Sequence, residues 1–118
     1  SMRMWQGASG VSSFEGIVSP AYTVFKLNER ADAKFVGFLF KTHRLIGTFK
    51  SHSQGLTSDT WNLKYPTLKR IKIMLPSIDE QLKVVEILSQ FDVNIESLSK
   101  RIQAAEQLKK GLLQQMFV

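Results

Sequence analysis

The sequence predicts an α+β fold, in which a small mixed body over residues 1–76 precedes one long coiled-coil helix over residues 77–118. Two observations indicate strands in the body. Residues 16–27 are rich in β-branched and aromatic side chains, and over 70–75 Ile71, Ile73 and Leu75 alternate with Arg70, Lys72 and Met74. The third observation is an apolar repeat of about 3.5 residues in the last third of the chain, which is typical of a coiled coil. With 118 residues, the chain is long enough for one ordinary domain and too short for two.

The two expected strands lie at opposite ends of the body. Residues 3–15 are rich in glycine and serine and are expected to form a loop. The strand at 16–27 should be interrupted near Pro20, because proline cannot donate a hydrogen bond to a sheet. The strand at 70–75 has the period of two that predicts one buried face, and Pro76 ends it.

Short helices and loops are expected between these strands. Asp32 suits the N-cap of a helix over 33–43, where phenylalanine and leucine recur at helical spacing and are expected to enter the core. Residues 45–49 fit either a helix or a strand, and 50–60 are polar enough for a loop. A single helical turn is expected at 65–68.

The terminal helix has a clear start and an apolar seam. Ser77 and Glu80 have the spacing of a capping box, and no proline follows them. We expect the seam to contact a partner through eight residues, namely Leu88, Phe91, Ile95, Leu98, Ile102, Ala105, Leu108 and Leu112.

This helix is too long to be covered by its own body. A helix of this size is about 57 Å long, whereas a body of 76 residues is only about 30 Å across. Half of the seam must therefore find a partner helix, because exposing each Leu or Ile forfeits roughly 1.5–3 kcal/mol. The alternative is a helix that breaks near 92–94 and folds back as a hairpin.

The positive charge is confined to the body. The net charge of +6 divides into +7 over residues 1–76 and −1 over residues 77–118. Within 41–72 there are seven Lys and Arg residues against Asp59 alone. Such a balance favours nucleic acid as a partner, although a solvated surface of exposed lysines is the ordinary alternative.

The candidate DNA contacts divide by chemistry. Lysine and arginine suit phosphates, whereas shorter polar side chains can reach base edges. We expect phosphate contacts from Lys41, Arg44, Lys50, Lys69, Arg70 and Lys72. We expect base-edge contacts from His52, Ser53, Gln54 and Thr57.

The sequence contains no recognisable motif of a catalytic or metal site. The chain has no cysteine, which excludes disulfides, thiolate metal sites and cysteine nucleophiles. It contains no Gly-rich phosphate loop, no HExxH and no GxSxG motif, so we expect a protein that is not an enzyme and binds no cofactor of its own. There is also no leader and no apolar run of membrane length, so we expect a cytoplasmic protein.

Residues 71–81, Ile-Lys-Ile-Met-Leu-Pro-Ser-Ile-Asp-Glu-Gln, and residues 108–117, beginning Leu-Lys-Lys-Gly-Leu-Leu, resemble two stretches of one known family, the specificity (S) subunit of Type I restriction-modification enzymes. The first is similar to the end of a target recognition domain in that family, and the second to the end of its spacer helix. Val-Ser-Pro-Ala-Tyr at 18–22 and the expected helix after Asp32 are weaker matches to the second half of such a domain.

The resemblance implies a subunit that recognises DNA and carries no chemistry. Its long spacer helices would dock methylation (M) subunits, which bind S-adenosylmethionine and are joined by restriction (R) subunits. This chain has only one such helix and about half of a recognition domain, so it would be a C-terminal fragment, a truncated paralogue or a short half-subunit. A second copy is then the expected partner, in an antiparallel homodimer. An assembly or decoy module that does not bind DNA is the alternative.

Overall fold

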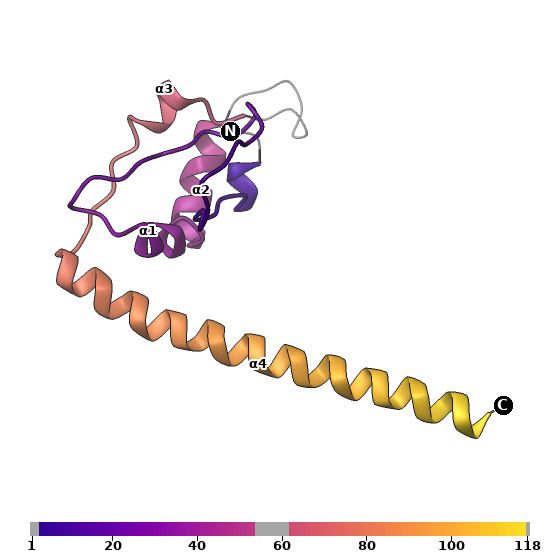
Figure 1. The fold of residues 1–118 in the computed structure, drawn as a ribbon. Coiled ribbons are helices and arrows are strands. Elements are labelled where there is room, and N and C mark those ends of the chain that lie inside the picture. The colour runs from indigo at the N-terminus through magenta and orange to yellow at the C-terminus, as the bar shows by residue number, and fades with distance from the viewer. Residues whose placement is uncertain (1–2, 54–61, 118) are drawn as a thin grey trace. The chain divides into compact units, whose positions relative to one another are not determined.

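The computed structural model describes residues 3–53 and 62–117. These residues form a short 3₁₀ helix and four α-helices (Figure 1). In chain order the elements are η1 (Met4–Gln6), α1 (Ala33–Leu39), α2 (His43–His52), α3 (Tyr65–Leu68) and α4 (Ile78–Met116). The chain divides into two compact units, Ser1–Leu82 and Lys83–Val118, so the first turn of α4 belongs to the first unit. No described helix is both long and apolar enough to cross a membrane.

The predicted α+β class is wrong, because the described residues contain helices and no strand. Neither 16–27 nor 71–76 pairs with a neighbouring strand, and both keep apolar side chains in solvent, with Ile17 101% and Met74 96% exposed. The β-propensity at these positions is a local property. A strand also needs a second segment to accept its hydrogen bonds, and the alternation of residues over 70–75 does not specify one.

The core of the first unit is small and is built around α2. Leu45 and Phe49, four residues apart, are buried on one side of this helix, and the Phe40 ring packs edge-on against Phe49 with centroids 5.3 Å apart. The core contains Met4, Leu45, Phe49, Leu63 and Leu68. Residues from η1, α2 and α3 therefore meet in one cluster, although up to 64 positions separate them in the sequence.

The helix predicted over 33–43 is shorter than expected and is followed at once by a second helix. Asp32 caps α1 as predicted, since its carboxylate accepts a hydrogen bond from the backbone N–H of Phe35 at 3.0 Å. The first helix ends at Leu39, with Phe40 as its C-cap. Thr42 has extended backbone angles and caps the next helix, because its hydroxyl oxygen accepts from the N–H of Leu45. The ambiguous segment 45–49 is helical, as part of α2, and the predicted turn at 65–68 is α3.

The side chain of Gln81 joins the first turn of α4 to the rest of the first unit. It is completely buried and uses both ends of its amide. Its Nε2 donates to the carbonyl oxygens of Arg30 and Pro76, each at 2.9 Å, and its Oε1 accepts from the backbone N–H of Asp32 at 2.8 Å. The start of α4 is thus bonded to the loop that precedes α1, 49 to 51 residues earlier in the chain.

The long terminal helix is continuous. α4 runs for 39 residues, which corresponds to about 58 Å. It passes through 92–94 without interruption, so the alternative of a hairpin broken at these residues is wrong. Ser77 caps its start, with its Oγ accepting from the N–H of Glu80 at 3.4 Å, as the sequence predicted.

Substitution of Gln81 tests whether its buried amide stabilises the first unit. Gln81→Met keeps the length of the side chain but leaves one N–H and two carbonyl groups without their partner. We expect the free energy of unfolding to fall by at least about 2 kcal/mol, measured by urea denaturation followed by tryptophan fluorescence. The control is Gln107→Met on the exposed part of α4, which should change it by less than about 0.5 kcal/mol. Equal effects of the two substitutions would contradict a role for the buried amide.

Candidate nucleic-acid interface

Helix α2 presents a basic outer face because its apolar residues are turned into the core. Leu45 and Phe49 anchor the helix, while Arg44 and Lys50 remain exposed on its other sides. The helix contains no acidic residue, so no neighbour along the same helix neutralises these charges.

A second basic segment attaches to the same core through α3. Leu63 and Leu68 are buried in the cluster that holds α2, and the basic residues around them are exposed. We define the basic surface as five of these exposed residues from the two segments: Arg44, Lys50, Lys69, Arg70 and Lys72. Helices α2 and α3 contact each other, so the fold unites charges that lie some twenty residues apart in the sequence.

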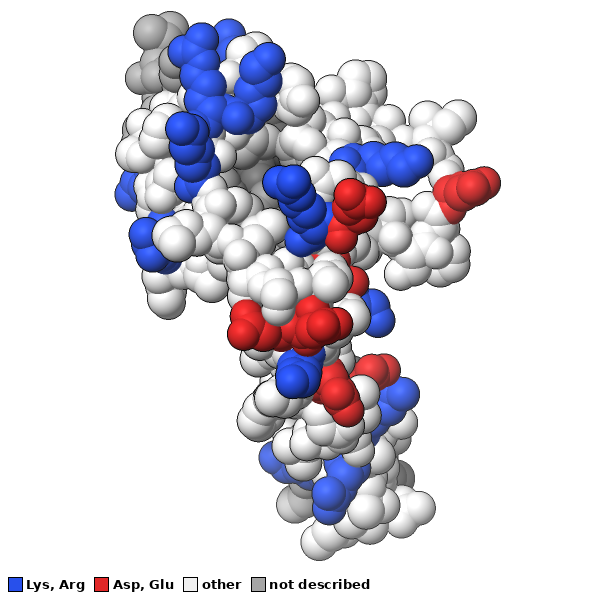
Figure 2. Space-filling view, turned by 90° about the vertical axis from the view of Figure 1, so that its left-hand side faces the viewer, with Lys and Arg blue, Asp and Glu red and all other residues white. Residues whose placement is uncertain are grey.

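Few carboxylates are available to neutralise this surface. Residues 33–53 and 62–76 contain eight Lys and Arg and no Asp or Glu. Within the described part of the chain, the one ion pair joins Lys100 and Glu96 in α4, at 3.4 Å. Figure 2 shows several Lys and Arg side chains gathered on one face of the first unit. Such a surface attracts a polyanion over a distance of about 10 Å at moderate ionic strength.

Lys41, one of the predicted phosphate contacts, has a structural role as well. Its Nζ donates to the carbonyl oxygen of Gly7 and to that of Ser9, the latter at 2.6 Å. An ammonium group has three N–H donors, so two of them hold the N-terminal segment against the start of α2. Lys41 is therefore not part of the basic surface defined above.

The predicted base-edge contacts lie at or beyond the end of α2. The Nδ1 of His52 lies 2.8 Å from the carbonyl oxygen of Thr48. Because a carbonyl oxygen can only accept, Nδ1 is the donor in this contact, and in a neutral imidazole Nε2 is then an acceptor. The hydroxyl of Ser53 donates to the carbonyl oxygen of Phe49 at 2.7 Å, which closes the last turn. Gln54 and Thr57 lie outside the described residues.

Two side chains that the sequence did not single out support this arrangement. Trp5 packs against the core, and the Nζ of Lys50 lies 6.0 Å from the centre of its ring, at the limit of a cation–π contact. Gln81 is the last residue of the stretch 71–81 that resembles a known family, but nothing in the sequence around it indicated that its side chain is buried. A glutamine four residues after the cap of a helix is usually exposed. The backbone groups of Arg30, Asp32 and Pro76 explain why Gln81 is buried here.

The predicted partner seam of α4 is largely exposed. Five of its apolar side chains, Phe91, Ile95, Leu98, Ile102 and Leu108, are between 54% and 65% exposed. Leu112 is 48% exposed, and Leu88 is partly buried. Further apolar residues, among them Ile87 and Leu113, widen this surface beyond a single row. A helix with this much apolar surface is typical of one that packs against another helix.

Comparison with known protein families identifies the chain. Residues 5–107 match the sequence profile of the family described as "Type I restriction modification DNA specificity domain". The chain belongs to this family. The matched stretch covers both the basic first unit and most of α4, and it confirms the resemblance found at residues 71–81 and 18–22.

Three relatives of this specificity domain come from Methanocaldococcus jannaschii. The Type I restriction enzyme MjaVIII specificity subunit is 30% identical over 97% of this chain and 27% of its own length. The MjaIX specificity subunit is 34% identical over 73% of this chain and 19% of its own length. The putative MjaX specificity subunit is 40% identical over 42% of this chain and 12% of its own length. No solved structure gives a significant match.

The chain therefore spans about a quarter of the length of the first of these relatives. All three are named as specificity subunits, which agrees with the prediction of a component that is not itself an enzyme.

Substitution of Lys41 should separate its structural role from the exposed bases. Lys41→Met removes the donor to two backbone carbonyls, and we expect the free energy of unfolding to fall by about 1 kcal/mol. Lys69→Met, the matched control, removes an exposed charge and should change it by less than about 0.5 kcal/mol. Urea denaturation of both variants measures the difference, and a stability of Lys41→Met equal to that of the control would refute the structural role.

Proposed function

We propose that this specificity domain recognises DNA through the basic surface, as part of a Type I restriction-modification assembly. The single observation that carries the proposal is that two basic segments, whose described residues 33–53 and 62–76 contain no Asp or Glu, are joined on one core. The family description adds the nature of the polyanion, since it is a DNA specificity domain. Residues 1–76 are the DNA-recognising part in this proposal, and residues 77–118 are the spacer helix.

The two kinds of side chain have different tasks in this proposal. The guanidinium and ammonium groups of the basic surface bind phosphates, which fixes the position of the domain on the duplex. His52, Gln54 and Thr57 read base edges in this proposal, and His52 would use its Nε2, which accepts when the ring is neutral and Nδ1 donates to Thr48. Lys41 and Ser53 contribute indirectly, because they hold the two ends of the region that carries these contacts.

The long helix serves assembly in this proposal. Its exposed apolar side chains pair with the same helix of a second copy, antiparallel, so that the dimer has two DNA-recognising parts. The same helix pair docks methylation subunits, which bind S-adenosylmethionine, and restriction subunits join through them. The support is the apolar surface of α4 and the specificity-subunit names of the relatives.

DNA binding that depends on salt tests the role of the basic surface. The double variant Arg44→Gln/Lys69→Gln should lower the slope of log K against log salt by up to about 1.8, because each phosphate contact contributes about 0.9. Fluorescence anisotropy with a labelled duplex between about 50 and 200 mM salt measures this slope. The control is Lys100→Gln on α4, which should leave it unchanged. Binding measured with methylation subunits present provides the same readout for the assembled complex.

A slope that the double variant does not alter would contradict the proposed surface. A complete absence of salt-dependent binding, by the chain alone and with methylation subunits, would favour the alternative of an assembly or decoy module. In that case the helix would exchange into other specificity subunits while the basic charge served only solubility.

Acidic substitutions on the helix seam test the dimer. Leu98→Asp and Ile102→Asp each place a carboxylate among apolar side chains in both copies. We expect each to weaken dimerisation by at least about 100-fold, since roughly 1.5 kcal/mol or more is lost per copy. Sedimentation equilibrium measures the dissociation constant. Gln107→Asp, on the side of α4 away from the seam, is the matched control, and a dimer that survives both seam substitutions would refute the seam.

A further inference from the structure

The seam of α4 has a defined heptad pattern that includes one charged residue. A heptad has two core positions. Starting from the partly buried Leu88 and counting in steps of seven, the first core position contains Leu88, Ile95, Ile102 and Lys109. The other core position is occupied by Val84, Phe91, Leu98, Ala105 and Leu112. Ile87 and Leu108, which are 60% and 65% exposed, fall at a flanking position and not in the core.

We infer that α4 pairs with α4 of a second copy in one antiparallel register, in which Ile95 of each copy lies opposite Leu98 of the other. The inference rests on the proposed antiparallel dimer and specifies how its two helices are aligned. Opposite residues in this register include Phe91 with Ile102 and Leu88 with Ala105, so a larger side chain meets a smaller one at the latter position.

The flanking residues are compatible with this register. In an antiparallel pair, like flanking positions of the two helices face each other, and their chemistry decides the alignment. Ile87 of one copy meets Leu108 of the other, which explains why both flanking positions are apolar. Asp92 meets Ser99 and Arg101 meets Asn94, so no two like charges oppose each other.

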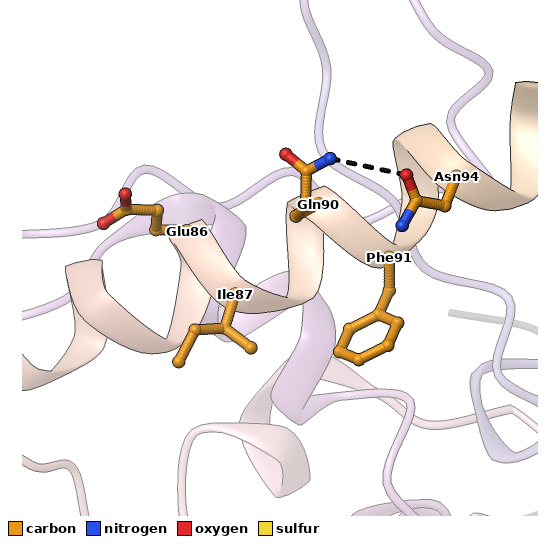
Figure 3. A pocket seen from close by; sticks show the side chains of 5 residues that line it. All are labelled: Glu86, Ile87, Gln90, Phe91 and Asn94. Carbon is orange, nitrogen blue, oxygen red and sulfur yellow. Dashed lines mark hydrogen bonds between the residues drawn. The ribbon is translucent and has the colours of Figure 1, made fainter.

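The surroundings of Phe91 and Asn94 in α4 agree with this assignment. Figure 3 shows Ile87 and Phe91 projecting from the same side of the helix, beside a shallow pocket that these residues line with Glu86, Gln90 and Asn94. The Nε2 of Gln90 donates to the Oδ1 of Asn94 at 3.4 Å, which orients that oxygen. A carbonyl oxygen accepts two hydrogen bonds, so the same atom can accept from Arg101 of the second copy.

Shifting the helices by one heptad in either direction creates repulsion. With Ile102 opposite Leu98, Arg101 of one copy faces Arg101 of the other, and Asp92 faces Glu106. With Ile95 opposite Phe91, Asp92 of one copy faces Asp92 of the other. A larger shift, with Ile102 opposite Ala105, shortens the overlap and sets Arg101 against Leu108. Like charges directly opposite each other are destabilising, so both single-heptad shifts are disfavoured.

A parallel pair of helices is disfavoured by a residue at a core position of the heptad, although its flanking residues would be favourable. Parallel helices in register would place Arg101 near Glu106 of the second copy, which is favourable. They would also place Lys109 directly against Lys109 of the second copy at a core position, where two like charges lie close together. In the antiparallel register Lys109 instead lies opposite Val84, along which its aliphatic stem can pack while the ammonium group reaches water.

Disulfide trapping tests this register directly, because the chain has no cysteine of its own. We expect an equal mixture of Ile95→Cys and Leu98→Cys to form the mixed disulfide when oxidised with diamide, since these two positions lie directly opposite each other. Each of these variants alone should cross-link much less, because its two cysteines lie in neighbouring layers of the pair. Leu88→Cys and Ala105→Cys should not form covalent dimers singly. An equal mixture of these two variants should form the mixed disulfide, identified by its mass. Gln107→Cys, on the outer side of the helix, measures random collision.

The pattern of cross-links distinguishes the competing arrangements. Covalent dimers from all four single variants would show parallel helices, and absence of both mixed disulfides would show a shifted register. Both results would overturn the inference while leaving a dimer in place. Sedimentation of the reduced variants reports whether the dimer exists at all. The salt dependence of DNA binding tests the basic surface separately, so that failure of the register and failure of DNA recognition are distinguishable.

Discussion

The buried amide of Gln81 is the contact on which the arrangement of the first unit depends. One side chain satisfies three backbone groups, two from the loop before α1 and one from the residue that ends the approach to α4. A neutral amide suits this place because it both donates and accepts, whereas a carboxylate could only accept and an apolar chain could do neither. Since unmade hydrogen bonds of buried groups are costly, the first turn of α4 and the segment around Asp32 form as one structure.

That bond also explains how a unit with a very small core remains defined. Among the described residues, six apolar side chains are buried, and five of them form the cluster around Phe49. Much of the rest of the unit is held by polar contacts to the backbone, from Asp32, Lys41, Thr42 and Gln81. The consequence for function is that α2 and the segment after α3 are fixed to each other through the core, while their charged residues remain in solvent. The basic surface is a product of this packing.

The helical parts of the chain were predictable because their signals are local. Asp32 is followed by apolar residues at helical spacing, Ser77 stands three residues before Glu80, and no proline follows, so α1 and α4 begin where expected. The prediction of strands was wrong because a strand depends on a second segment and not on local signals alone. The alternation around Ile73 and the β-branched residues near Ile17 indicate a preference, but a strand forms only when a partner segment is present, and the described residues supply none. The proposed DNA contacts rest on a density of charge that the sequence shows, but the sequence could not reveal that Lys41 and Ser53 bond to backbone carbonyls.

The sequence by itself determined that the chain carries a basic part and a nearly neutral helix with an apolar seam, because charge balance and heptad spacing are properties of neighbouring residues. It also contained the stretches that resemble the specificity-domain family. Only the tertiary structure decided that α2 and α3 share one core, that Lys41 supports the N-terminal segment, and that Gln81 is buried. The physical reason is that each of these depends on backbone groups or core residues far away in the chain, and their proximity is created by packing and not by sequence spacing.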